Sequence, residues 1–237
     1  MKQRIWELDV FRGICILGMV AVHFLYDLVE LYGLVDWEYP DAFLFIAEYG
    51  GILFLLLSGI CVTLGTRCIK RGLIVFACGM LCTAVTLGMV LLDLADWDMV
   101  IWFGILHCLG CCMLLWPIVK KLPAIALAGI GVLFAAVGNW LYGVTPVDFP
   151  YLIFLGICPP RFFSPDFFPL LPNFGYFLLG AVLGRTIYRK QTSLFPNCDP
   201  NTPLVVFLSA CGRHSLAIYL LHQPLLSGLC LLLALIL

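Results

Sequence analysis

Residues 4–30 read RIWELDVFRGICILGMVAVHFLYDLVE, an apolar stretch that contains several ionisable side chains. Its centre, residues 13–25, is apolar enough to enter a lipid bilayer as a helix. At 100° per residue, Arg12 and His23 differ in azimuth by only about 20° after three full turns. Asp27 follows His23 by one helical turn. The stretch therefore predicts a membrane-spanning helix with one polar stripe along it.

This polar stripe reaches the middle of the predicted membrane. Arg12 precedes His23 by a helical rise of about 16 Å, so an interfacial Arg12 places His23 near the centre of a roughly 30 Å hydrocarbon core. His107 in WFGILHCLG and His222 in SLAIYLLHQP each lie about nine residues inside a predicted span, at the same depth. A single membrane histidine is more often a residue that hydrogen-bonds between helices. Three at one depth, with Asp27 beside His23, instead predict a shared functional site.

The composition places the chain in a bilayer. Of its 237 residues, 63% are hydrophobic and 11% are charged, and the mean hydropathy is +1.07. Soluble domains carry about 25% charged residues, so we predict an all-α integral membrane protein. The net charge of −1 says nothing about nucleic-acid binding, but no basic run suggests it, so no nucleic-acid partner is predicted.

The cysteines and histidines also raise the question of a metal. The chain has 12 cysteines, most of them in apolar segments, where cysteine behaves as a small hydrophobic residue. Packing is the favoured interpretation of the densest group, Cys108, Cys111 and Cys112. Three histidines at one depth have the composition of a metal site, but His107 and His222 lack neighbouring carboxylates. We therefore predict no metal and no disulfide framework.

Seven segments are long and apolar enough to cross the membrane. We predict a single transmembrane domain over residues 1–237, built as a polytopic bundle of about seven helices. Residues 204–211 are interpreted as a lead-in to the last helix. The predicted spans are 11–30, 43–65, 72–92, 98–117, 123–142, 170–188 and 213–236.

Positive charge predicts the orientation of this bundle. Of the 13 Lys and Arg residues, all but Arg161 fall on one side of the predicted spans. By the positive-inside rule, the N-terminus is therefore cytoplasmic and the C-terminus is outside. The residues on the cytoplasmic side are Lys2, Arg4, Arg12, Arg67, Lys70, Arg71, Lys120, Lys121, Arg185, Arg189, Lys190 and Arg213.

The longest outer connection covers about residues 142–172 and is rich in Pro and Phe, as in CPPRFFSPDFFPLLP. A long structured loop on one face usually covers or lines a site. Arg161 and Asp166 in this loop are therefore candidate contacts to an acceptor substrate. A local ion pair at the surface is the alternative for the same two residues.

Five stretches of the chain match one known family in order. They are LDVFRGICILGMVAVH at 8–23, FLLLSGICVTLG at 54–65, WFGILHCLG at 102–110, DFFPLLPNFGYFLLGAVLGR at 166–185 and GRHSLAIYLLHQP at 212–224. Together they resemble the heparan-alpha-glucosaminide N-acetyltransferase catalytic-domain family and its small bacterial relatives. Arg12 and His23 also match the spacing of an Arg, ten residues and a His in the wider transmembrane acyltransferase superfamily.

The resemblance implies an acyl-CoA donor, with acetyl-CoA as the expected form, and a sugar-type acceptor. In the family's lysosomal member, the position of His23 looks like Asn and the catalytic His lies slightly further on. This chain has no histidine between His23 and His107, so the catalytic role is carried to His23 on the spacing from Arg12. Because the chain is shorter than that member, we expect a bacterial cell-envelope glycan or lipid-linked sugar, and a bacterial cytoplasmic membrane.

The predicted chemistry uses the intramembrane histidines. His23, oriented by Asp27, is predicted to take a proton from the acceptor hydroxyl or amine, which then attacks the thioester carbonyl. His107 and His222 are predicted to donate to the developing oxyanion or to hold the acceptor. Direct transfer and an acyl-histidine intermediate both stay open.

The basic cytoplasmic face is predicted to bind the phosphates of acyl-CoA. Arg12 is the first candidate, followed by Arg71 and Arg213, because guanidinium groups bind phosphate through paired hydrogen bonds. Topology alone also requires basic residues on this face. Charge therefore does not by itself separate the two interpretations.

Two other classes of protein compete with the acyltransferase. A proton-coupled carrier of a small polar metabolite would use His23 and Asp27 as a proton relay, but carriers usually show internal repeats, which this chain lacks. A purely structural membrane partner leaves the mid-depth histidines unexplained. Self-association into a homo-oligomer is compatible with all three classes.

Overall fold

The structure is a computed structural model that describes residues 4–142, 147 and 149–236. Within these residues the chain forms eight α-helices and no strand, which confirms the predicted all-α fold. The helices group into two compact units. The first unit runs up to Phe54 and resumes at Lys190, and the second unit is Leu55–Arg189. The single domain predicted over residues 1–237 stays a prediction.

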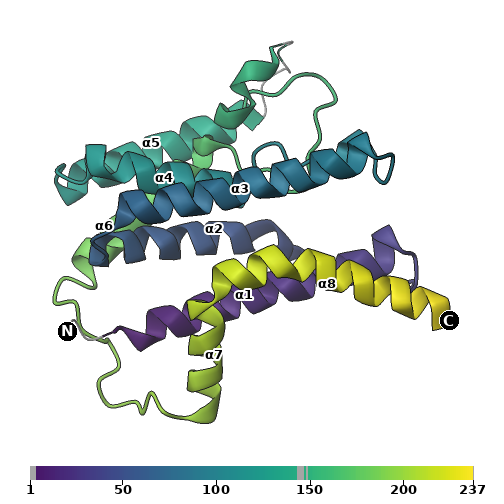
Figure 1. Cartoon of the computed structure of the whole chain (residues 1–237). Helices are drawn as coiled ribbons and strands as arrows, with labels where there is room; N and C mark the ends of the chain where they lie inside the picture. Colours follow the sequence, from purple (N-terminus) through teal and green to yellow (C-terminus); the bar gives the residue numbers. More distant parts are fainter. Residues whose placement is uncertain (1–3, 143–146, 148, 237) are drawn as a thin grey trace. The chain divides into compact units, whose positions relative to one another are not determined.

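The first unit is built on α1 (Trp6–Tyr26), which continues into a π-helical turn, Asp27–Leu31. Helix α8 (Ser215–Ile236) lies beside α1, and the short helix α7 (Pro203–Arg213) crosses the first half of α1 (Figure 1). Part of α2 (Asp41–Leu64) also belongs to this unit.

Two glycines allow α1 and α7 to cross at backbone contact. A Cβ atom built on Gly13 of α1 would overlap the carbonyl oxygen of Leu208 in α7. A Cβ atom on Gly212 of α7 would overlap the carbonyl oxygen of Asp9 in α1. Small residues at a helix crossing are the usual means of close packing in membranes, because lipid provides little hydrophobic driving force.

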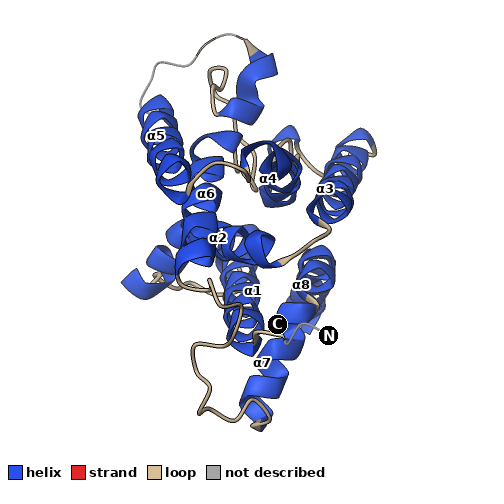
Figure 2. Ribbon diagram, turned by 90° about the vertical axis from the view of Figure 1, so that its left-hand side faces the viewer, coloured by secondary structure: helices blue, strands red, loops and turns tan. Residues whose placement is uncertain are grey.

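The second unit contains α3 (Cys68–Leu91), α4 (Ile105–Val119), α5 (Ala124–Tyr142) and α6 (Leu170–Thr186). Figure 2 shows these helices in the spatial order α3, α4, α6, α5, in agreement with their packing. The remaining part of α2 packs closely on α6, since a Cβ atom on Gly180 would overlap the Leu56 carbonyl oxygen.

Each predicted span corresponds to a helix, but the lengths differ. Five helices are long and apolar enough to cross a membrane, counted over the described part of the chain. Helices α4 and α6 are shorter, with 15 and 17 residues. The predicted lead-in to the last span is a separate helix, α7, which ends one residue before His214.

The predicted span 98–117 begins too early, because its first part is not α-helical. Helix α4 starts at Ile105, and residues 100–104 before it lie outside any helix. Thr83 donates a hydrogen bond to the Ile101 carbonyl at 2.6 Å, and the Thr86 hydroxyl accepts the Ile101 N–H at 3.2 Å. Side chains of α3 therefore satisfy backbone groups that would otherwise lack partners in a membrane.

In the described part of the outer connection predicted at about 142–172, Pro150–Leu155 forms a 3₁₀ turn and α6 begins at Leu170. This turn ends at Gly156, whose φ of 98° favours glycine. Residues 143–146 and 148 of the connection, together with Lys2 of the basic N-terminal segment, lie outside the described residues.

Candidate functional site

Two of the three predicted histidines meet in the first unit. The imidazole rings of His23 on α1 and His222 on α8 make an edge-to-face contact, with centroids 4.9 Å apart and planes at 85°. His222 is only 9% exposed, and His23 is half-buried. Equal depth predicted a shared site of all three histidines, and packing of α8 against α1 brings two of them together.

The backbone determines which nitrogen of each ring holds the proton. Nδ1 of His23 lies 2.9 Å from the Met19 carbonyl oxygen, and Nδ1 of His222 lies 2.5 Å from that of Tyr219. A carbonyl oxygen can only accept, so Nδ1 of each neutral ring is the donor. Nε2 of each ring then has a lone pair and can take a proton. Both histidines are therefore arranged as bases.

Asp27 is bound by Gln223, which is not among the residues predicted from sequence. The amide Nε2 of Gln223 donates to both carboxylate oxygens of Asp27 at 3.0 Å, and Asp27 is 1% exposed. This bond joins the π-helical turn after α1 to α8. Asp27 thus orients α8, whereas His23 is oriented through its Nδ1 bond to Met19. π-helical turns are frequent at functional sites.

Replacing Gln223 by alanine should destabilise the first unit. The change leaves the buried carboxylate of Asp27 without its donor, which costs about 1–3 kcal/mol or more for a charged group. Thermal unfolding of the purified protein in detergent measures the loss. In a double-mutant cycle, Asp27→Asn should cost less in the Gln223→Ala protein than in the wild type. Additive effects of the two changes would contradict the contact.

His107 lies in the second unit and has a different environment. Its Nδ1 accepts the N–H of Gly104 at 3.1 Å, which caps the start of α4. Its Nε2 is therefore protonated in the neutral ring and lies 3.3 Å from the Thr83 hydroxyl. The ring packs against Phe76 and Phe103. Both nitrogens are occupied, and the catalytic role of His107 stays a prediction.

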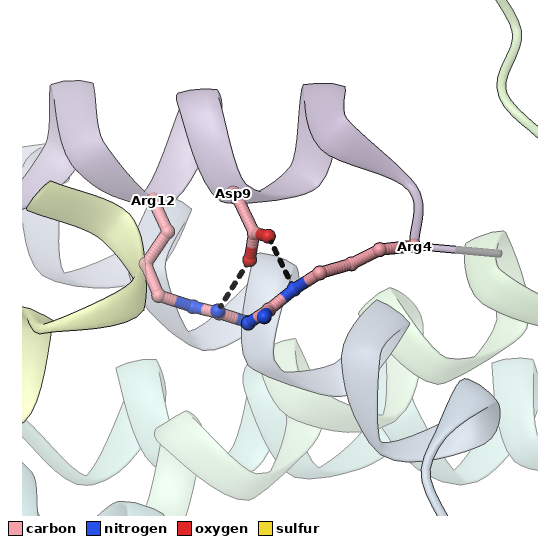
Figure 3. Close-up of polar contacts among 3 residues, drawn as sticks. All are labelled: Arg4, Asp9 and Arg12. Carbon is pink, nitrogen blue, oxygen red and sulfur yellow. Dashed lines mark hydrogen bonds and ion pairs between the residues drawn. The ribbon is translucent and has the colours of Figure 1, made fainter. Parts of the chain in front are cut away.

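Arg12 shares one buried carboxylate with a second arginine. Asp9, which is 6% exposed, contacts Arg12 at 3.4 Å and Arg4 at 2.8 Å through its two oxygens (Figure 3). The two arginine side chains come from opposite directions, and their guanidinium groups lie next to one another on one side of the carboxylate (Figure 3). Two arginines and one aspartate give the trio a formal charge of +1. We call Arg4, Asp9 and Arg12 the arginine pair site. Asp9 is not among the residues predicted from sequence, because an acidic residue in the first turn of a helix is ordinary.

The other predicted binding residues are placed separately. Arg71 and Arg213 are exposed, at the start of α3 and the end of α7. Arg161 is also exposed and has a φ of 61°. The Asp166 carboxylate accepts the N–H of Ile105 at 3.2 Å and so caps α4. The acceptor contacts predicted for Arg161 and Asp166 stay predictions.

Replacing Asp166 by alanine should lower the stability of the second unit by about 1 kcal/mol, the usual cost of losing a helix cap. The Michaelis constant for the acceptor should stay unchanged if capping is the role of this carboxylate. A thermal shift and acceptor titration on the same preparation separate the two roles. An unchanged melting temperature with a raised Michaelis constant would instead support the predicted acceptor contact.

An apolar groove of about 300 Å³ lies beside His222. Val20 of α1 forms one wall, and among the described residues His222 is the one lining residue with a polar side chain. The other lining residues all belong to α8: Ala217, Ile218, Leu221, Leu225 and Leu226. The surface of this groove is apolar throughout, so His222 lines it with carbon atoms and not with a ring nitrogen.

The fold and these contacts define a polytopic helical membrane protein with an imidazole pair in its first unit. A family model described as heparan-alpha-glucosaminide N-acetyltransferase, catalytic, matches residues 4–224. The chain therefore belongs to this family of membrane acetyltransferases, as its sequence motifs predicted. Comparisons with curated proteins and with solved structures gave no match.

Proposed function

We propose that the protein transfers an acyl group, with acetyl as the expected group, from cytoplasmic acyl-CoA to a glycan or lipid-linked sugar of the cell envelope. The observation that supports this proposal is the His23–His222 contact, in which both Nε2 atoms are left as proton acceptors. Family membership supplies the reaction class.

In the proposed reaction His23 is the general base. Its Nε2 takes the proton of the acceptor hydroxyl or amine as that group attacks the thioester carbonyl, and CoA leaves as the thiolate. The contact with His222 and the bond to Met19 hold the ring in one orientation, which supports proton transfer at a fixed position. Asp27 adds a negative charge near His23 that would stabilise the imidazolium.

The donor is proposed to bind at the arginine pair site. Asp9 holds Arg4 and Arg12 near one another, and each guanidinium has several N–H donors, enough to bind Asp9 and a phosphate at once. Asp9 is then a positioning residue. Arg71 and Arg213 are retained as further candidates, since their exposed side chains lie at helix ends on the side proposed to be cytoplasmic.

This orientation gives a labelling prediction. In a protein with Cys158 as its single cysteine, an impermeant maleimide should label Cys158 in intact cells. A cysteine that replaces Lys120 should stay unlabelled there. Burial raises the pKa of the Cys158 thiol, so less of it is thiolate at neutral pH and labelling should be faster at mildly alkaline pH. Labelling at position 120 but not at Cys158 would contradict a cytoplasmic binding site for acyl-CoA.

A transfer screen tests the proposed function. The purified protein in nanodiscs would receive acetyl-CoA with a labelled acetyl group, together with a bacterial lipid extract or a set of glycans. The expected result is label in one class of product, identified by mass spectrometry. Donor binding without labelled product from either acceptor set would contradict the proposal.

A further inference from the structure

Helix α8 has a weak point in its backbone beside the histidine pair. Pro224 lies inside this helix, and a proline has no N–H to donate to the carbonyl four residues earlier, here that of Leu220. Helices bend most readily where such a bond is missing. His222 lies between these two residues, so the position of its ring relative to α1 depends on contacts between the two helices.

Two contacts of this kind involve neighbouring residues of α8. The rings of His23 and His222 meet edge to face, with centroids 4.9 Å apart. One residue further along α8, Nε2 of Gln223 donates to both carboxylate oxygens of Asp27 at 3.0 Å. Hydrogen bonds to a charged group are strong and depend on direction, whereas an edge-to-face contact of rings is weaker. The bond to Asp27 is therefore the contact that can fix the rotation of α8.

The surroundings of Asp27 favour a persistent bond. Asp27 is 1% exposed, so water cannot replace the amide of Gln223 as a donor unless the contact opens. A hydrogen bond in such a buried place is electrostatically stronger than in water. Asp27 also begins the π-helical turn, in which its carbonyl accepts the N–H of Tyr32 at 2.9 Å. The backbone thus holds the carboxylate in place on the α1 side, and Gln223 binds it from α8.

We propose that Gln223 is a positioning residue for acyl transfer. Its bond to Asp27 fixes the rotation of α8, and α8 in turn holds the His222 ring against the ring of His23. The inference rests on the proposed role of His23 as the general base, because contact with His222 restricts the direction in which His23 can present its Nε2. Gln223 itself touches no reacting atom. A displacement of about 1 Å at a reacting group can lower a rate about a hundredfold.

The ring contact can be measured without substrate by nuclear magnetic resonance. The chain has four histidines, so isotope labelling of histidine alone gives few ring signals, which single His→Ala variants assign. In the wild type a nuclear Overhauser effect should connect the ring protons of His23 and His222. Gln223→Leu removes the amide donor at similar size and should abolish most of this effect. Ser227→Ala removes a polar group one turn further along α8 and should leave the effect unchanged.

An exchange of charge between the two positions tests the role in transfer. Gln223→Glu places a second carboxylate against Asp27 and should lower kcat by about tenfold or more, with an unchanged KM for acetyl-CoA. In an Asp27→Asn background the same substitution should raise kcat, because the amide at position 27 can then donate to the carboxylate at position 223. The measured quantity is kcat per folded molecule, which a loss of stability alone does not change. This comparison decides the question even if the Gln223→Leu protein does not fold.

An inter-ring effect that persists in the Gln223→Leu protein would overturn the proposal. An equal loss of kcat on Gln223→Glu in both backgrounds would also overturn it, since Gln223 would then act without Asp27. Transfer at the wild-type rate by a Gln223→Leu protein that has lost the ring contact would reject this inference and leave the acyltransferase in place. A wild-type protein that transfers no acyl group, but loses its ring contact on Gln223→Leu, would reject the proposed function and support the positioning of the two rings.

Discussion

Replacing Gly13 by leucine is expected to abolish the folded protein. The Cβ atom alone would overlap the Leu208 carbonyl oxygen, which is backbone of α7 and cannot move aside as a flexible side chain can. Forcing extra atoms into a packed crossing costs about 1–3 kcal/mol and sometimes more, and here α1 and α7 must separate. Size-exclusion chromatography and thermal unfolding of the extracted protein should show little monodisperse material and a strongly lowered melting temperature.

The control for this experiment is Gly228→Leu on α8. A Cβ atom at Gly228 has nothing within 4 Å, so the same substitution meets open space. This variant should be recovered at wild-type yield. A Gly13→Leu protein with wild-type yield and melting temperature would contradict the crossing of α1 and α7.

Replacing His23 by alanine is expected to lower acyl transfer by about a hundredfold or more, the usual scale for loss of a general base. Expression and acyl-CoA affinity should stay near wild type, because the ring is only half-buried and contacts no residue of the arginine pair site. Asp27→Asn should cause a smaller loss of rate, since it removes a charge rather than the base. The measurement is the transfer rate per folded molecule.

His214→Ala is the matched histidine control. His214 is exposed between α7 and α8, and this change should leave transfer unchanged. A structural role of His23 would give less folded protein with normal turnover. If the His23→Ala protein is folded and transfers acyl groups at the wild-type rate, His23 is not the base.

The helices were largely predictable because long apolar runs in a chain with 11% charged residues have few alternatives. The histidine pair was predictable in part, since equal depth indicates a shared level in the membrane. Equal depth does not tell which helices are neighbours. The structure places His23 with His222 in the first unit and places His107 in the second unit, at a helix cap.

Three features of the structure could not be predicted from the sequence. The first is the start of α4, since residues 100–104 have the apolar composition of a membrane span. Their non-helical backbone is stabilised by hydrogen bonds from side chains of α3 and the outer loop, which the local sequence does not indicate. Gln223 follows His222 directly, and only contact with Asp27 distinguishes it from an ordinary polar residue in a membrane helix. The π-helical turn Asp27–Leu31 depends on i→i+5 bonds that composition does not predict.

The proposed acyltransferase and a proton-coupled carrier differ in whether CoA is released. The most direct test measures free CoA and acylated acceptor together, using purified protein in nanodiscs, acetyl-CoA and an acceptor fraction from the bacterial envelope. Our account predicts that both products appear at the same rate, in equal amounts, and only when the acceptor is present. Proton-driven uptake of a polar metabolite by reconstituted vesicles, with no release of CoA under any acceptor, would contradict it.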